Sequence, residues 1–576
     1  MEGFTLTIID STGIQEYIFG SNKLKENIGA SHLLVQVSQD WLYQALEQVA
    51  PGAHNFGADY TIRLRPLEQN DDQKIEVIYR GGGNIVILSR NETIAQDVVR
   101  TLSRKLLGSA PGLEITAAHR TLTAADTIGG QNGAYNDLLR VLNRAKQQRR
   151  HSAPQLGLGV TLECRATGLP AVYYDGEENR FVSAEIDAKL AAVDAANDRL
   201  KEEFGDIYKL YAFGLDFDDF GRSRDDSSYI AVIHADGNGM GRRFEQLVAQ
   251  FGSAAQDRAC LDALHNLSRA VERSAEAALK ASMHQLNEAL KTHGESELDE
   301  RMRQFTVGLQ QHGQKSIFPV RPLVFGGDDL TLVCDGRLGL ALAALYLKKF
   351  HEHTTEHFAK LNFPIEDTNS KARLQEPAYA CAGVAVVKAH YPFARAYALS
   401  EALCSHAKTK LRDEKRADAS AMDWHFAATG ISADLGELRK RQYGVKRNKA
   451  ASEKLDDLTM RPITVGGPGI GQAWREWDVL RGLIETFVNK DEWRERHNKV
   501  VALREALRAD DVERFRRNYK IRLLPELNGG DRKLCETGWS DKRAATEKFD
   551  RSGYFDAIEA LEFYLPIEPV TVKEAA

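Results

Sequence analysis

Three aspartates, Asp236, Asp328 and Asp329, are the residues whose type and spacing best suit metal chemistry. Asp236 ends an apolar, strand-like run, and the Asp328-Asp329 pair follows Gly326-Gly327 in a turn between two further apolar runs. Mg²⁺ and Mn²⁺ prefer oxygen ligands, and carboxylates on neighbouring strands can share two such ions. Two ions activate a hydroxyl nucleophile and neutralise a leaving pyrophosphate. We therefore predict that these aspartates are the metal ligands and catalytic residues of a nucleotidyltransferase.

Small residues beside the aspartates are predicted to hold the nucleotide. Gly326 and Gly327 allow a ligand to approach the backbone closely. Gly237, Asn238 and Gly239 come between the strand and a helical pattern, where free backbone amides can cradle phosphates. A bulkier residue at these glycines would block a triphosphate.

Two other polar residues lie near the predicted site. Lys408 belongs to a helical pattern over residues 393–410 and is predicted to reach the β- or γ-phosphate. Lys410 is the alternative, and a cation near a helix C-terminus is also favourable for electrostatic reasons alone. His234 is expected to face the opposite side of the sheet from the metal rather than to act as a general base.

The strand and helix patterns occur twice along the chain. Both copies combine an apolar run ending in Asp-x-x-Gly, a helix and a glycine-rich hairpin, in the β-α-β-β-α-β order of a ferredoxin-like fold. The first hairpin turn reads Gly-Gly-Gly-Asn and the second Gly-Gly-Asp-Asp, so only the second is predicted to bind metal. We predict an α+β protein with two ferredoxin-like (palm/cyclase) domains, a small middle module and a C-terminal helical domain. The predicted domains are 1–155 (degenerate palm), 156–226 (middle module and linker), 227–425 (catalytic palm) and 426–576 (helical).

Composition limits the class of protein. The 576 residues, of which 43% are hydrophobic and 27% charged, are typical of a folded multidomain chain. A net charge of −6 excludes a strongly basic surface overall. Two basic tracts, residues 144–150 and 439–449, are candidate RNA contacts, with a solvated helix face as the alternative. The chain has no leader-like start and no apolar run of membrane-spanning length, so we expect a cytoplasmic protein without membrane contact.

Several of these segments together resemble the large, polymerase-like subunit of type III CRISPR effector complexes. The resemblance rests on the segments Asp10-Ser-Thr-Gly-Ile-Gln-Glu-Tyr, Gly29-Ala-Ser31-His-Leu-Leu, His-Ala-Asp236-Gly-Asn-Gly-Met-Gly, Phe-Gly-Gly-Asp328-Asp329 and Ala407-Lys408. It implies two palm domains packed face to face and a C-terminal domain that contacts other subunits of an RNA-guided complex.

The resemblance also implies an activity and its cofactors. Such subunits convert ATP into cyclic oligoadenylates when target RNA is bound, with Mg²⁺ or Mn²⁺ at the Gly-Gly-Asp-Asp palm. It implies guide and target RNA as partners, and a place for Ser31 in the pocket between the palms. Relatives often carry an N-terminal histidine-aspartate nuclease domain, which we do not expect here. The middle module has one cysteine, Cys164, where relatives bind zinc through paired cysteines, so no zinc is expected.

Other functions stay open from the sequence. A diguanylate cyclase has a similar hairpin that ends in Glu-Phe, where this chain has Asp329-Leu330. A non-catalytic scaffold for the same kind of complex is a second alternative, although clustered carboxylates without a cation repel one another. A third is an enzyme that transfers AMP to another acceptor. Adenine and guanine cannot be separated at this point.

Overall fold

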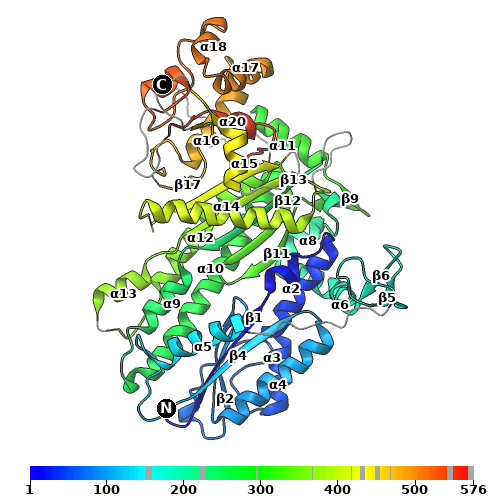
Figure 1. Cartoon of the computed structure of the whole chain (residues 1–576), viewed down its shortest axis with the longest axis vertical. Coiled ribbons are helices and arrows are strands. Elements are labelled where there is room, and N and C mark those ends of the chain that lie inside the picture. Colours follow the sequence, from blue (N-terminus) through cyan, green and yellow to red (C-terminus); the bar gives the residue numbers. More distant parts are fainter. Residues whose placement is uncertain are drawn as a thin grey trace.

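The computed structural model in Figure 1 describes most of the chain. The described residues are 1–148, 159–220, 228–292, 296–365, 367–416, 418–427, 435–447, 455–467, 469–494, 496–540 and 549–568. The predicted domain boundaries at 155/156 and 226/227 and the C-terminal ends of both basic tracts lie outside these ranges. No helix within them is long and apolar enough to cross a membrane.

The N-terminal part is built on a four-stranded antiparallel sheet. Its strands run in the spatial order β2-β3-β1-β4, which is the ferredoxin-like order for a β-α-β-β-α-β chain. The strands are β1 (Thr5–Thr12), β2 (Ile75–Gly81), β3 (Asn84–Ser89) and β4 (Glu114–Thr121). The helices are α1 (Ile14–Phe19), α2 (Leu24–Ser38), α3 (Asp40–Val49), α4 (Glu92–Ser109) and α5 (Ala134–Gln148), with a 3₁₀ turn at Leu67–Gln69.

A second, six-stranded sheet repeats this order and extends it. Its spatial order is β11-β12-β8-β13-β14-β17, and its first four strands match β2-β3-β1-β4 one for one. The strands are β8 (Tyr229–Gly237), β11 (Val320–Gly326), β12 (Asp329–Asp335), β13 (Ala380–Lys388), β14 (Ser420–Ala427) and β17 (Ile463–Val465). The predicted α+β fold with a duplicated palm is therefore confirmed. Because β14 ends and β17 lies beyond residue 425, this sheet reaches into the segment predicted as the C-terminal domain.

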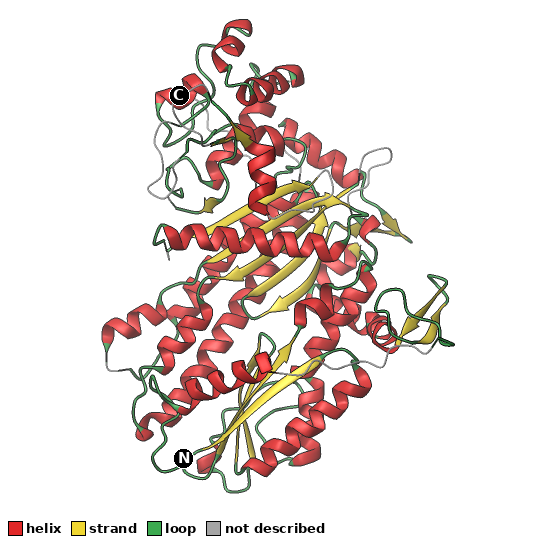
Figure 2. Ribbon diagram, in the orientation of Figure 1, coloured by secondary structure: helices red, strands yellow, loops and turns green. Residues whose placement is uncertain are grey.

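Helices cover both faces of the second sheet (Figures 1 and 2). Along β8, Ala231 and Ile233 pack in one core with α10 (Asp257–Lys291) and α12 (Gly339–Ala359), whereas Ile230 and Val232 pack in another core with α14 (Phe393–Asp413). This follows from the alternation of side chains along a strand. The helices of this part are α9 (Met240–Val248), α10 (Asp257–Lys291), α11 (Glu297–Val307), α12 (Gly339–Ala359), α13 (Thr368–Gln375) and α14 (Phe393–Asp413), with a 3₁₀ turn at Ala254–Gln256.

A small unit joins the two palms, and a helical unit follows them. The small unit appears at the right of Figure 1 and contains the buried Cys164. Its elements are β5 (Ala171–Asp175), β6 (Arg180–Ser183), α6 (Ala184–Ala191), α7 (Val193–Glu203), α8 (Gly205–Leu210), β7 (Tyr211–Phe213) and a 3₁₀ turn at Phe217–Asp219. β7 pairs with β10 (Lys315–Phe318), which also pairs with β9 (Gln311–His312). The last unit contains α15 (Leu435–Tyr443), β15 (Gly444–Val445), β16 (Asp456–Asp457), α16 (Trp477–Asn489), α17 (His497–Arg508), α18 (Val512–Asn518), α19 (Arg532–Thr537) and α20 (Phe555–Ala560).

Candidate active site

The sheet brings the three predicted aspartates together. Asp329 on β12 lies directly opposite Asp236 on β8 in the antiparallel register. Asp328 is the last turn residue before β12, and its carbonyl accepts a hydrogen bond of 3.2 Å from the amide of Gly237. Residues separated by 92 positions in the chain thus meet at one end of the sheet. Carboxylates brought together in this way offer the oxygen ligands that a hard divalent cation prefers.

The glycines before the aspartates shape a tight turn. Gly326 and Gly327 have φ angles of 141° and 80°, which side chains rarely allow. A Cβ added at Gly327 would lie 3.5 Å from the backbone of Gly82, in the glycine turn of the N-terminal palm. The two hairpin turns therefore face each other at close range. This contact places the predicted catalytic turn at the boundary between the two palms.

Lys408 on α14 reaches the same point from the helix above the sheet. Its Nζ donates to Asp236 Oδ2 at 2.5 Å and to the Gly237 carbonyl at 3.0 Å. Burial alone would lower the pKa of Lys408, but the neighbouring Asp236 raises it. Lys408 is therefore a firmly charged ammonium beside the aspartates.

Electrostatics at the turn favour the arrival of a cation. Burial, reinforced by the charge of Asp236, raises the pKa values of Asp328 and Asp329 to about 7. Asp329 nevertheless keeps 43% of its side-chain surface accessible, so an ion can reach its carboxylate. Among the described residues, no group of three or more His, Cys, Asp or Glu side chains is already arranged as a metal cage. Lys408 provides the compensating charge at Asp236.

His234 does not lie where the sequence suggested. Its Nδ1 is 3.4 Å from Asp329 Oδ1, and the ring lines the same cavity as Asp236. The expectation that His234 faces away from the metal was wrong, because residues two apart on a strand share one face. Burial lowers its pKa, so the ring is neutral at neutral pH.

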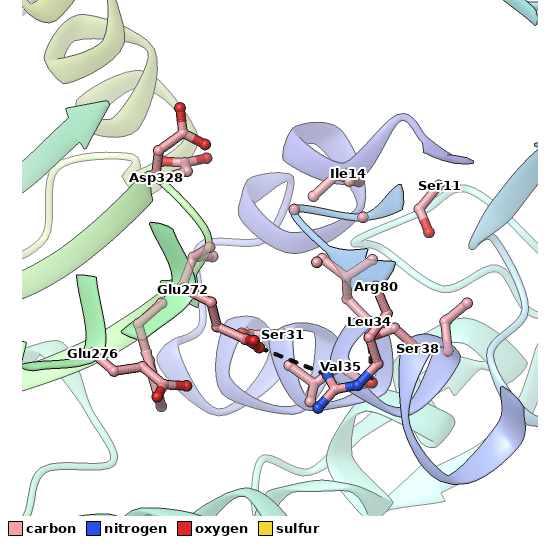
Figure 3. A pocket seen from close by; sticks show the side chains of 18 of the residues that line it. Ser11, Ile14, Ser31, Leu34, Val35, Ser38, Arg80, Glu272, Glu276 and Asp328 are labelled. Atoms are coloured by element: carbon pink, nitrogen blue, oxygen red, sulfur yellow. Dashed lines mark hydrogen bonds and ion pairs between the residues drawn. The ribbon is translucent and has the colours of Figure 1, made fainter. Parts of the chain in front are cut away.

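A cavity of about 710 Å³ opens between the two palms at this point (Figure 3). This volume lies in the range of small-molecule sites. Gly81, Gly82 and Gly83 of the first turn line one side of the cavity, and the predicted site residues Ser31, Asp236, Gly326, Asp328, Asp329 and Lys408 also line it. The hydroxyl of Ser31 donates to the Leu323 carbonyl.

Four residues predicted to bind the nucleotide are not part of the cavity lining: Gly237, Asn238, Gly239 and Gly327. The backbone amide of Asn238 donates to the Tyr379 carbonyl at 2.8 Å, and its side-chain amide donates to the Ala419 carbonyl at 3.1 Å. Both amides therefore connect the end of β8 to the residues before β13 and β14 instead of facing a nucleotide. Gly239, with φ of 67°, precedes α9.

Some lining residues were not among the predicted site residues. Gln15 of the N-terminal palm donates to Glu401 of α14 at 2.9 Å, across the gap between the palms. Arg80, Glu272 and Glu276 also line the cavity, from β2 and α10. Arg80, Glu272 and Glu276 belong to no motif, and only the packing of the palms brings them to the site.

The N-terminal palm keeps part of the same arrangement. Asp10 occupies in β1 the place of Asp236 in β8, and in the register it lies opposite Asn84, as Asp236 lies opposite Asp329. Lys146 on α5 forms an ion pair with Asp10, as Lys408 does with Asp236. The two palms thus share this ion pair, and they differ at the position opposite the aspartate, where the first has Asn84 and the second Asp329.

Comparison with known proteins gives similarity at the level of the fold. No family model matches the chain, and no curated protein matches it. Three similar solved structures, all with a TM-score of 0.49, are a Csm1-Csm4 cassette in complex with pppApA (15% identity, covering 97% of this chain and 69% of that one), a Csm1-Csm4 cassette in complex with cA4 (14%, 98% and 70%) and Csm1 in T. onnurineus (14%, 98% and 70%). The similarity extends over nearly the whole chain but does not by itself assign an activity.

Proposed function

We propose that this chain is a palm-type nucleotidyltransferase that makes cyclic oligoadenylates from ATP within a type III CRISPR effector complex. The observation that carries the proposal is the pairing of Asp236 with Asp329 across β8 and β12, with Asp328 beside them and the cavity in front. A duplicated palm agrees with it, because two facing palms supply walls for a nucleotide cavity. The residue motifs named above support the family.

The donor set fits Mg²⁺ or Mn²⁺. All three side chains offer carboxylate oxygens, which hard divalent ions prefer, and Asp328 and Asp329 are short of positive charge. When bound, the ions would activate the attacking hydroxyl and neutralise the pyrophosphate. Asp236, Asp328 and Asp329 are the residues that would hold them.

The other groups of the site would act on the nucleotide itself. Lys408 lies beside Asp236 and would contact the phosphates. Its positive charge would stabilise the negative charge that develops on the leaving group. The glycine turns leave room for the triphosphate at the boundary of the palms. The cavity would keep the reacting hydroxyl and triphosphate in one orientation.

We further propose that other subunits, a guide RNA and a target RNA are the partners of this chain. The solved structures of similar fold include Csm1 together with Csm4, in complex with pppApA and with cA4. Compounds of this class are the products that we propose here.

Mass spectrometry of the products tests the proposal. The chain is incubated with ATP or GTP and Mn²⁺, alone and assembled with partner subunits, guide and target RNA. We expect adenylate rings or oligomers from the unaltered complex and none from the Asp328→Asn/Asp329→Asn double variant. Asp418→Asn, at an exposed aspartate, should retain the products.

Other products would select among the alternatives. Cyclic dinucleotides from GTP would indicate a diguanylate-type cyclase, and AMP attached to a different acceptor would indicate an adenylyltransferase. An assembled complex that consumes neither nucleotide would establish the scaffold. Calorimetric titration with Mn²⁺ gives an independent readout, because only the double variant should lose metal affinity.

A further inference from the structure

An open groove lies in the C-terminal unit, beside α18 and the turn that follows it. Its volume is about 610 Å³. In Figure 1, α18 is at the end of the molecule opposite the N-terminal palm, so the groove is separate from the cavity between the palms. Most of its lining is charged, with four basic residues and two acidic ones: Arg516, Arg517, Lys520, Arg522, Glu513 and Glu536.

The segment that forms the groove carries an excess of positive charge. Residues 512–522 contain five basic residues and one acidic one, in a chain whose net charge is −6. Arg517 lies 3.8 Å from Glu513, and both side chains are more than two thirds exposed. Glu536 already pairs with Arg532 at 2.9 Å. Exposed ion pairs of this kind contribute little, so an anionic partner can displace them at small cost.

Arg516 holds the groove in shape. Its Nη1 donates to the Glu536 carbonyl at 2.9 Å, and its Nη2 donates to the Arg522 carbonyl. The guanidinium thus connects α18 to α19 and to the turn after α18. Ile521 in this turn is buried, whereas Lys520 and Arg522 on either side of it are exposed. The exposed cations are therefore presented by an ordered backbone.

An exposed aromatic ring adjoins these cations in the chain. Tyr519 keeps 41% of its surface accessible. Its ring centroid is 4.9 Å from that of Phe515, which is buried. Tyr519 is therefore anchored on the core while part of it stays in solvent. A ring held in this way offers a surface on which an unpaired base can stack.

The cations and the ring together indicate the class of partner. Guanidinium and ammonium groups bind phosphate oxygens. An acidic protein surface would use the cations alone, and a double helix keeps its bases stacked inside it. A single strand of nucleic acid offers both phosphates and unpaired bases.

We propose that this groove, with Tyr519, binds a single-stranded segment of RNA. The inference rests on the proposed function in one respect, because RNA is the nucleic acid of the proposed complex. It goes beyond that function by assigning a binding surface at a distance from the aspartates. The contacts to phosphate and to base faces predict binding without a strong sequence preference.

Fluorescence anisotropy of the full chain with a labelled oligo(U) of about 12 nucleotides tests this, without ATP. We expect the logarithm of the association constant to fall against the logarithm of the KCl concentration with a slope of about −2, as for three phosphate contacts. The Arg517→Gln/Lys520→Asn double variant should bind about tenfold more weakly and reduce the slope by about 1.4. Asparagine tolerates the φ of 54° at Lys520, so the turn should keep its conformation.

A matched double variant separates the groove from net charge. Arg303→Gln/Lys360→Asn removes the same charge from two exposed side chains, on α11 and directly after α12, and should leave the RNA affinity nearly unchanged. Equal losses in both double variants would overturn the inference, because net charge alone would then govern binding.

The ring is tested by Tyr519→Leu, which keeps an apolar contact with Phe515. It should weaken binding about fivefold without changing the salt slope, because stacking releases no counterions. The inference is overturned if the unaltered chain binds no oligo(U), or if either Tyr519→Leu or the Arg517→Gln/Lys520→Asn variant binds as tightly as the unaltered chain.

Two competitors distinguish other polyanions. Polyglutamate that displaces labelled oligo(U) as effectively as unlabelled oligo(U) would indicate an acidic protein surface as the partner. Oligo(dT) that binds more tightly than oligo(U) would indicate single-stranded DNA. Either result would overturn the assignment to RNA.

The RNA-binding readout is independent of product formation. A chain that makes no product in any assembly, but whose RNA affinity depends on Arg517, Tyr519 and Lys520, would retain the inference and contradict the cyclase. A complex that makes oligoadenylates while these variants bind RNA like the unaltered chain would do the reverse.

Discussion

Lys408 contacts Asp236, one of the three proposed metal ligands, and lines the cavity that we propose for the nucleotide. In the structure its charge is matched by Asp236 at 2.5 Å. In the proposed function, divalent cations held by Asp236 would free the ammonium of Lys408 for a phosphate. A single side chain thus compensates the charge of the site in two situations, with and without nucleotide.

Replacing Lys408 by methionine tests this role. We expect Lys408→Met to lower kcat/KM for ATP by about 100-fold, since removal of one donor to developing charge typically has this effect. Lys410→Met, two residues further along α14, should change it far less. Pyrophosphate release by the assembled complex is the measurement. Equal losses in both variants would indicate a general effect of charge on α14 instead.

At the scale of elements, the position of α14 on β13 decides where Lys408 lies. Gly383 in β13 faces the backbone of this helix, and an added Cβ would lie 1.9 Å from the Ser400 carbonyl oxygen and 2.5 Å from the Cys404 amide nitrogen. The helix backbone cannot yield as a flexible side chain would. A glycine at this position therefore allows the close approach of strand and helix.

Gly383→Ala should accordingly destabilise the protein by about 1–3 kcal/mol, as overpacking does. The matched control is Gly482→Ala in α16, where a Cβ has open space and the helix should gain up to about 1 kcal/mol. Urea unfolding followed by circular dichroism measures both. A loss below about 0.5 kcal/mol for Gly383→Ala would mean that α14 shifts at little cost.

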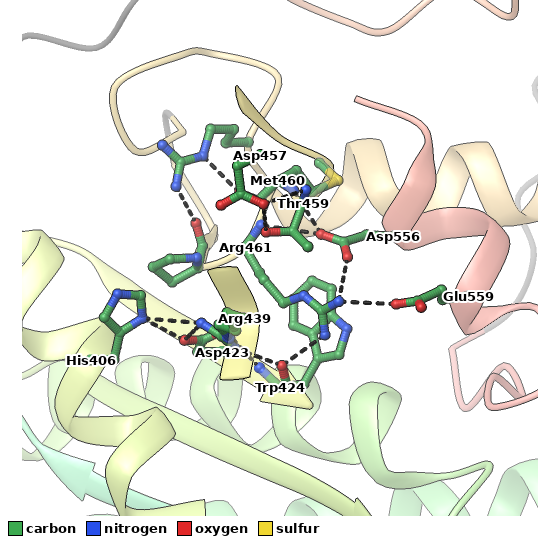
Figure 4. Close-up of polar contacts among 12 residues, drawn as sticks. His406, Asp423, Trp424, Arg439, Asp457, Thr459, Met460, Arg461, Asp556 and Glu559 are labelled. Carbon is green, nitrogen blue, oxygen red and sulfur yellow. Dashed lines mark hydrogen bonds and ion pairs between the residues drawn. The ribbon is translucent and has the colours of Figure 1, made fainter. Parts of the chain in front are cut away.

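At the scale of the whole molecule, buried ion pairs connect the second palm to the C-terminal unit (Figure 4). Asp423 on β14 contacts His406 on α14 at 2.6 Å and both terminal nitrogens of Arg439 on α15 at 2.7 and 2.8 Å. Arg461 donates to the Trp424 carbonyl at 2.8 Å and pairs with Asp556 on α20 at 2.9 Å. The helix that carries Lys408 is therefore tied to the unit that follows the palm.

The Asp423 contacts predict a pH-dependent stability. Burial alone would raise the pKa of Asp423, but Arg439 and His406 hold it well below its usual value. With a folded pKa below the unfolded one, the stabilisation is fully present above about pH 4 and is lost as the pH falls below it. Asp423→Asn should cost about 3–5 kcal/mol at pH 7, because it leaves a buried Arg439 unpaired.

Unfolding in urea at pH 7 and pH 3 tests the sign. The difference in the free energy of unfolding between the unaltered chain and Asp423→Asn should be smaller at pH 3 than at pH 7. Asp418→Asn, which removes an exposed partner of Arg416, should cost about 0–1 kcal/mol. A difference that stays constant between the two pH values would show that the carboxylate charge of Asp423 is not what stabilises the fold.

Local patterns in the sequence determined the duplicated fold and the proximity of the aspartates. Alternating apolar runs predicted the strands, and glycines predicted the hairpin turns. The two-copy β-α-β-β-α-β order and the neighbourhood of Asp236 and Asp329 then followed from the ferredoxin-like topology. Ser31 and Lys408 line the cavity, and their contact with a nucleotide stays a prediction, whereas His234 was assigned to the wrong face of its strand.

Only the tertiary structure decided how the two palms meet. The contact between the turns at Gly82 and Gly327, the ion pair of Lys146 with Asp10 and the meeting of Arg199 and Glu276 in the cavity lining join segments far apart in the chain. No local pattern marks such residues, because their proximity comes from packing between domains. The sequence by itself thus determined that carboxylates meet at one end of the cavity, and the packing of three units decided the shape and charge of the rest of it.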